Sequence, residues 1–120
     1  MAEEEVVFAY IHGGFTRRSF FRDVDVAVWI KHAEKAFKFI VHLSAKLEAE
    51  LGIPVDIQVL NEAPLPFKYH VYTEGKLLLS KNDLLRTKEV NTTIRKYLDL
   101  EKLIEYASSR SNHEPNSSKQ

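Results

Sequence analysis

The chain contains no cysteine. Disulfides, thiolate metal sites and a cysteine nucleophile are therefore excluded, and the composition fits an intracellular protein. The chain also lacks an excess of charge of either sign, because 17 Lys and Arg residues balance 17 Asp and Glu residues. This balance gives no overall electrostatic signal for a nucleic-acid partner or a membrane surface.

Long apolar runs are missing as well. No stretch reaches the ~20 consecutive apolar residues of a membrane-spanning helix. The N-terminus is acidic, and the apolar run from Val6 is only about six residues long, which is unlike a signal peptide. We therefore expect a cytoplasmic protein with no membrane partner. Its 120 residues, 44% of them hydrophobic and 28% charged, suffice for one globular domain.

Hydrophobic periodicity predicts an α+β fold, with a mixed β-sheet and helices packed on one face. Alternating or short apolar runs predict strands at Val6–Ile11, Asp23–Ile30, Val55–Leu60 and Lys76–Ser80. Helical spacing predicts helices at Ala33–Leu51, Phe67–Glu74 and Asp83 to about Ala107. Ser108–Gln120 contains no apolar residue, so we expect a domain over residues 1–107 and a disordered tail over 108–120.

Three aspartates occupy the predicted strands, where aspartate is uncommon. Asp23 and Asp25 are two residues apart, so their side chains point to the same side of one strand. Asp56 has the matching position in the next alternating strand, and it can share that face if the two strands pair. Carboxylates of this kind bind Mg²⁺ beside substrate phosphates, and two such ions can clamp the oxygens of a phosphoryl displacement.

The alternative interpretation is an ordinary strand. In that case Asp23 caps the start of the strand and Asp25 is an exposed residue of the alternation. The Asp-x-Asp pattern by itself does not separate the two interpretations. Asp56, in a second apolar strand, favours the metal site.

Gly13 and Gly14 follow the first predicted strand, and basic residues follow them. Glycines let a backbone approach a phosphate closely, and successive N–H groups can bind an anion. Arg17 and Arg18 add fixed positive charge beside this turn. We therefore predict nucleotide-binding roles for these four residues, with His12 as a further candidate for phosphate contact. A plain turn followed by a solvated basic loop is the alternative.

Together these motifs resemble the signature of the DNA polymerase β-like nucleotidyltransferase superfamily. That signature is a hydrophobic strand, a Gly-Gly or Gly-Ser pair, a spacer and an Asp-x-Asp strand. Here it reads Gly13-Gly14, then Asp23-Val24-Asp25-Val26. The stretch Val55–Pro64 (VDIQVLNEAP) is similar to the third-carboxylate strand of the minimal nucleotidyltransferases. The likeness covers roughly residues 6 to 107.

The resemblance implies transfer of a nucleoside monophosphate from a triphosphate, with ATP as the expected donor. It implies that Asp23, Asp25 and Asp56 bind two Mg²⁺ ions. It also implies a helical HEPN-type partner, because small bacterial and archaeal members are often antitoxins of HEPN toxins and some are thought to adenylylate them. Two departures concern the site: Gly14 stands where serine is usual, and His12 stands where a bulky apolar residue is common.

Three functional interpretations remain open. The first is a nucleotidyltransferase that modifies a protein or a small molecule. The second is a non-catalytic antitoxin with a vestigial nucleotide site, although retention of all three carboxylates favours the first. The third is an aminoglycoside-type transferase, which in a chain this short would need a homo-oligomer. Trp29 and Leu60 share the carboxylate side of their strands, where they either pack beneath a covering segment or form a partner-binding surface.

Overall fold

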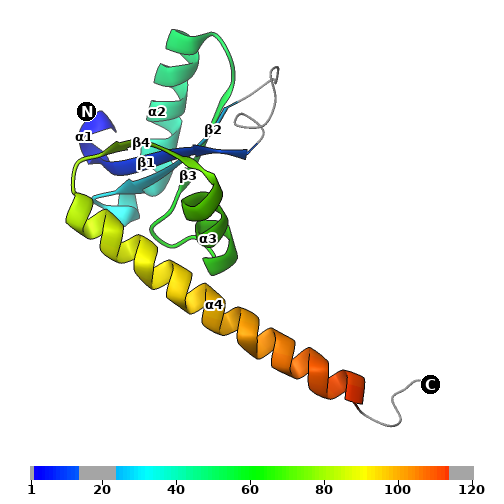
Figure 1. Cartoon of the computed structure of the whole chain (residues 1–120). Helices are drawn as coiled ribbons and strands as arrows, with labels where there is room; N and C mark the ends of the chain where they lie inside the picture. The colour runs from blue at the N-terminus through cyan, green and yellow to red at the C-terminus, as the bar shows by residue number, and fades with distance from the viewer. Residues whose placement is uncertain (1, 14–23, 114–120) are drawn as a thin grey trace.

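The computed structural model describes residues 2–13 and 24–113 (Figure 1). The strands of its sheet are β1 (Val6–His12), β2 (Val24–Ile30), β3 (Val55–Val59) and β4 (Lys76–Ser80). The helices are α1 (Ala2–Glu5), the 3-10 turn η2 (Ala33–Lys35), α2 (Ala36–Leu51), α3 (Leu65–Glu74) and α4 (Asp83–His113). Among residues 2–13 and 24–113, no helix combines the length and the apolar character that a membrane span requires.

The sheet is mixed, with the strand order β3-β2-β1-β4. β1 pairs antiparallel with β2 and with β4, whereas β2 and β3 are parallel. Parallel neighbours need a crossover connection, and α2 supplies it between β2 and β3. The predicted α+β class with a mixed sheet is therefore confirmed.

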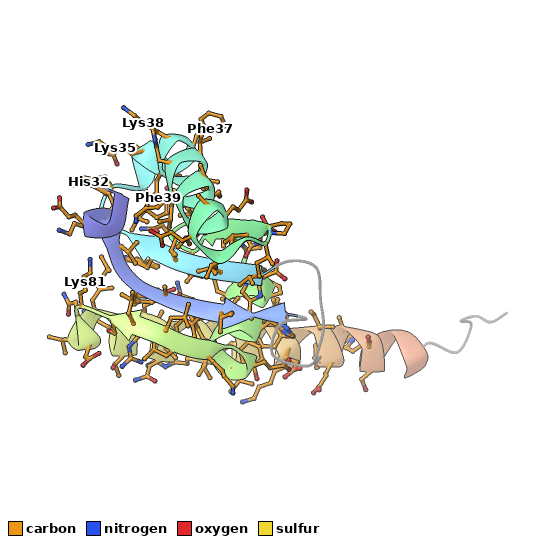
Figure 2. All side chains as sticks on the ribbon, turned by 90° about the horizontal axis from the view of Figure 1, so that it is seen from above. His32, Lys35, Phe37, Lys38, Phe39 and Lys81 are labelled. Carbon is orange, nitrogen blue, oxygen red and sulfur yellow. The ribbon has the colours of Figure 1, made fainter. Side chains whose placement is uncertain are left out.

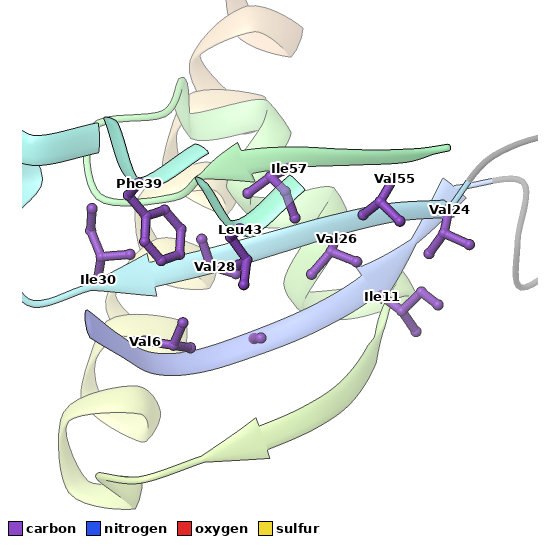
Figure 3. Packing of buried hydrophobic residues seen from close by; sticks show 11 residues of the cluster. Val6, Ile11, Val24, Val26, Val28, Ile30, Phe39, Leu43, Val55 and Ile57 are labelled. Atoms are coloured by element: carbon purple, nitrogen blue, oxygen red, sulfur yellow. The ribbon is translucent and has the colours of Figure 1, made fainter. Parts of the chain in front are cut away.

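The helix α2 covers one face of the sheet (Figure 3). Its inward residues Phe39 and Leu43 pack on the alternating apolar residues of β2 and β3, which are Val24, Val26, Val28, Ile30, Val55 and Ile57. Figure 2 shows Phe37 on the outer side of the same helix, and this residue is 81% exposed. The helix ends at Gly52, which has the left-handed conformation that a C-cap glycine supplies.

The opposite face is covered too, which corrects the expectation of helices on one face only. α3 and the first part of α4 pack there on a second apolar cluster, which consists of Phe8, Tyr10, Ala27, Leu60, Val71 and Tyr72. β1 and β2 carry apolar side chains on both faces, so the sheet needs a layer on each side. Leu60 is fully buried, and Trp29 stacks on Phe8 with 5.7 Å between ring centroids. Leu60 therefore packs beneath a covering segment, whereas Trp29 is only partly buried at the edge of the same cluster.

The helix α4 is longer than the helix expected to end near Ala107. It continues to His113, and the sequence offers no helix-breaking Gly or Pro after Asp83 until Pro115. Residues 101–110 are all exposed, and this part of α4 projects away from the body (Figure 1). The radius of gyration of 18.3 Å accordingly exceeds the ~14 Å of a compact chain of this length. The rest of the predicted tail, residues 114–120, lies outside the described residues.

Removal of Ser108–Gln120 should lower the melting temperature by no more than about 2 °C, because exposed positions usually contribute within ~0.5 kcal/mol. The residues of this segment whose side chains the structure describes are exposed and belong to neither apolar cluster. Thermal melts of the full and truncated chains measure the difference. A drop of about 10 °C would show that the segment packs on the domain.

Candidate metal and nucleotide site

Two of the three carboxylates predicted to bind metal lie where β1 ends and where β2 and β3 begin. Asp25 of β2 pairs in register with Asp56 of β3, and on its other side with His12 of β1. Residues in register point to the same face, and neighbouring strands are ~4.8 Å apart. Asp25 and Asp56 therefore lie side by side on the face opposite α2, where strand parity placed them.

This donor set fits a hard divalent cation. Both side chains are carboxylates, which are the ligands that Mg²⁺ takes in proteins. Asp56 is exposed and Asp25 is half-buried, so the pair is open to solvent. Within residues 2–13 and 24–113, no three His, Asp or Glu side chains gather into a metal-binding group. The third predicted ligand, Asp23, lies outside the described residues, as do Gly14, Arg17 and Arg18.

Gly13 brings the backbone against the Asp25 carboxylate. Its φ of 77° is in the left-handed region, which disfavours residues with a Cβ atom. A Cβ atom at this position would lie 2.6 Å from Asp25 Oδ2, well inside van der Waals contact. Backbone conformation and available space therefore both favour glycine here.

Gly13→Ala should impair the site more than the fold. The left-handed conformation costs an alanine about 1–2 kcal/mol, whereas the new Cβ atom forces the Asp25 carboxylate out of its place beside Asp56. We expect about 10-fold or greater loss of Mn²⁺ affinity in calorimetric titration. Gly52→Ala is the matched control, because its φ is also 77° but nothing lies within 4 Å of its Cβ position. Equal losses of affinity in both variants would exclude contact with Asp25 as the cause.

Two further polar residues lie beside this pair, and neither was predicted from the sequence to belong to the metal site. His12 Nε2 is 2.8 Å from Gln58 Oε1, and Gln58 Nε2 donates to Asp56 Oδ2 at 2.5 Å. His12 is only 7% exposed and packs edge-on against Phe67 of α3. The sequence did carry one signal for Gln58, since it is two residues from Asp56 and so shares its face.

Solved structures with the same fold include toxin–antitoxin complexes. A toxin–antitoxin complex with AMP-PNP matches with a TM-score of 0.70 at 22% identity, over 88% of this chain and 86% of that chain. A tri-AMPylated HEPN toxin of Shewanella oneidensis in complex with an MNT antitoxin gives 0.67 at 22% identity, over 88% and 82%. The toxin–antitoxin MntA-HepT gives 0.66 at 22% identity, over 88% and 83%. At these identities the likeness establishes the fold.

The comparison with curated proteins returned no match. The sequence does match the family model described as "Polymerase beta, Nucleotidyltransferase" over residues 1–84, which is more than half of the chain. The matched segment holds all four strands of the sheet, the turn at Gly13 and the register pair Asp25 and Asp56. The chain therefore belongs to the polymerase β nucleotidyltransferase family.

Proposed function

We propose that this chain is a metal-dependent nucleotidyltransferase that transfers AMP from ATP to an acceptor. One observation carries the proposal: Asp25 and Asp56 lie in register on adjacent strands, with the backbone of Gly13 against Asp25. This arrangement supports metal binding next to a turn suited to phosphate. Membership of the nucleotidyltransferase family supports the type of reaction.

Asp23, Asp25 and Asp56 are the proposed ligands of two Mg²⁺ ions. When bound, the ions supply positive charge that stabilises the triphosphate and the charge that develops during transfer. The sheet contributes rigidity, because Asp25 and Asp56 project from paired strands rather than from loops. Their relative position is thus set before any substrate binds.

Gly13 and Gly14 are proposed to offer backbone N–H groups to the triphosphate, and Arg17 and Arg18 to add fixed positive charge. In the reaction, an acceptor hydroxyl loses its proton to solvent and its oxygen attacks the α-phosphorus of ATP. The bond between this phosphorus and the oxygen that leads to the β-phosphate breaks. The acceptor is left with AMP attached, and pyrophosphate leaves.

The proposed acceptor and partner is a helical HEPN-type protein. One support is the related structure described as a tri-AMPylated HEPN toxin in complex with an MNT antitoxin. A second is the set of exposed apolar residues on the projecting part of α4, namely Leu103, Ile104 and Tyr106. Exposed apolar groups gathered on one element are typical of protein-binding surfaces. Of the two residues considered for a partner-binding surface, Leu60 is buried and does not support one. Trp29 lines an open groove with Val7 and Leu85.

The alternative function is an antitoxin that neutralises its partner by contact alone. The exposed apolar residues of α4 favour it, because contact would bury them without any chemistry. The paired carboxylates of Asp25 and Asp56 favour the enzyme instead. Like charges held in register repel each other unless a cation lies between them, and contact with a partner does not require such a pair.

The test uses this chain together with the protein that co-purifies with it from the native host. The two are incubated with ATP and Mg²⁺, and the intact mass of the partner is measured before and after. A nucleotidyltransferase will add the mass of one or more AMP groups to the partner, and a chelator will prevent the addition. A partner that stays bound but unmodified would contradict transfer and support the contact-only antitoxin.

A further inference from the structure

A hydrogen-bonded bridge crosses the sheet beside the carboxylates. It runs from His12 on β1 to Gln58 on β3 and ends at Asp56, so it passes over β2, the strand between them. Ala27 is the β2 residue in register with Gln58. Because Ala27 has no side-chain atom beyond Cβ, it leaves room above β2 for the two longer side chains to meet.

The chemistry of the carboxylate fixes the direction of each bond in this bridge. An ionised carboxylate only accepts hydrogen bonds, so the Gln58 amide presents its NH₂ group to Asp56. The amide oxygen then faces His12, and His12 Nε2 carries the hydrogen that is donated to it. The reverse orientation of the amide would bring two acceptor oxygens together at 2.5 Å.

The His12 end of the bridge is anchored in the core. Its ring packs against Phe67 at 84°, with 5.5 Å between ring centroids. The backbone at Gly75 also comes close, since a Cβ atom there would lie 3.4 Å from the His12 Cβ. A buried ring packed in this way has few alternative positions. The bridge thus connects a fixed group in the core to the exposed carboxylate of Asp56.

We propose that Gln58 and His12 are positioning residues for Asp56. Gln58 holds the Oδ2 atom, so that Oδ1 is the oxygen presented to a divalent cation next to Asp25, and His12 fixes the plane of the Gln58 amide. Hydrogen bonds of this kind orient metal-binding carboxylates, and their loss typically weakens metal affinity about 10–100-fold. The inference rests on the proposed function, because it requires that Asp56 binds metal.

The test is calorimetric titration of the full-length protein with Mn²⁺ alone. Gln58→Leu removes the donor to Asp56 at similar side-chain size, and Mn²⁺ binding should weaken about 10–100-fold. His12→Leu should also weaken binding, whereas His12→Gln should stay near the parent because its amide can still donate to Gln58. Asn91→Leu removes an exposed amide from α4 and should bind Mn²⁺ like the parent.

The two His12 variants separate positioning from packing. Both of them alter the contact with Phe67, but only His12→Gln keeps a donor, so a loss of affinity confined to His12→Leu supports positioning. Parent-like affinity in both Gln58→Leu and His12→Leu would overturn the inference. If melts without metal show that Gln58→Leu does not fold, the comparison of the two His12 variants alone tests the positioning role.

Failure of the proposed function would give a different pattern. The parent would then bind no Mn²⁺, or Asp25→Asn would bind it as tightly as the parent. Either result would exclude the positioning role as well. If Asp25→Asn loses affinity while Gln58→Leu and His12→Leu do not, the metal site stands and only the positioning role is removed.

Discussion

Asp25→Asn should lower the rate of AMP transfer about a thousandfold or more while the chain stays folded. Asparagine is nearly isosteric with aspartate, so the packing of β2 between β1 and β3 hardly changes. The substitution removes one charged oxygen ligand from the proposed metal site. Several kcal/mol of transition-state stabilisation are lost with such a ligand, at about tenfold in rate for each ~1.4 kcal/mol.

The same variant should change stability in opposite directions without and with ligand. Without metal, Asp25→Asn relieves repulsion from Asp56, its register partner, and should be as stable as the parent or slightly more stable. With Mg²⁺ and ATP the parent should be the more stable protein, because it keeps the full ligand set and binding to the folded state raises stability. Thermal melts with and without Mg²⁺ and ATP, paired with the transfer assay, measure both effects.

Glu50→Gln is the control for this experiment. It removes one carboxylate from an exposed ion pair with Lys46 on α2, on the other side of the sheet. Transfer and the response to Mg²⁺ and ATP should both stay at the parent's level. Transfer by Asp25→Asn at the parent's rate would contradict the metal site.

Glu89→Ala should lower the free energy of unfolding by about 2–3 kcal/mol and the melting temperature by about 10 °C. The carboxylate joins α3 to α4, because its Oε2 atom accepts hydrogen bonds from Lys68 at 3.0 Å, Tyr72 at 2.9 Å and Thr93 at 3.2 Å. The side chains of Lys68 and Glu89 are only 17% and 14% exposed. Water therefore replaces the lost acceptor poorly, and a charged amine remains without its partner.

Two controls bracket the effect of Glu89→Ala in chemical denaturation. Glu89→Gln keeps an acceptor and loses only the charge, so it should cost less than alanine. Glu50→Ala breaks the exposed pair with Lys46 and should cost less than ~0.5 kcal/mol. If Glu89→Ala costs no more than Glu50→Ala, the contact between α3 and α4 does not depend on this carboxylate.

The Tyr72 hydroxyl makes this network sensitive to alkaline pH. Burial, followed by the charge and hydrogen bond of Glu89, raises the pKa of Tyr72 far above its ordinary value of about 10. The folded state thus favours the protonated phenol, and the stability that it contributes is present below about pH 10 and is lost as the pH rises above that value. The free energy of unfolding, measured by urea denaturation, should fall less between about pH 8 and about pH 11 for Glu89→Ala than for the parent. Identical losses would mean that Glu89 does not act on Tyr72.

Strand parity predicted the side of its own strand on which each of Asp25 and Asp56 lies, because a period of two residues depends only on local sequence. The pairing of β2 with β3 then brings the two residues side by side. The same parity put Gln58 beside Asp56. It could not bring His12 to Gln58, because these residues are 46 positions apart and their contact depends on the register of β1 with β2 and of β2 with β3. The bridge needs a third element as well, since Phe67 of α3 packs against the His12 ring.

Local sequence patterns also gave no indication that helices cover the second face of the sheet. α3 is a short helix that buries only Val71 and Tyr72, so its sequence gives little indication of the sheet face that it meets. The burial of Leu60 in one cluster with these two residues follows from the tertiary fold alone. The end of α4 was placed too early for a related reason, because the weak helix formers after Ala107 continue a helix that is already formed.

The most direct test asks which part of ATP reaches the partner. The chain and its co-purified partner are incubated with Mg²⁺ and ATP labelled either at the α-phosphate or at the γ-phosphate. A nucleotidyltransferase leaves the α-label on the partner and releases the γ-label as pyrophosphate. Label on the partner from γ-labelled ATP, or from neither form of ATP, would contradict nucleotidyl transfer.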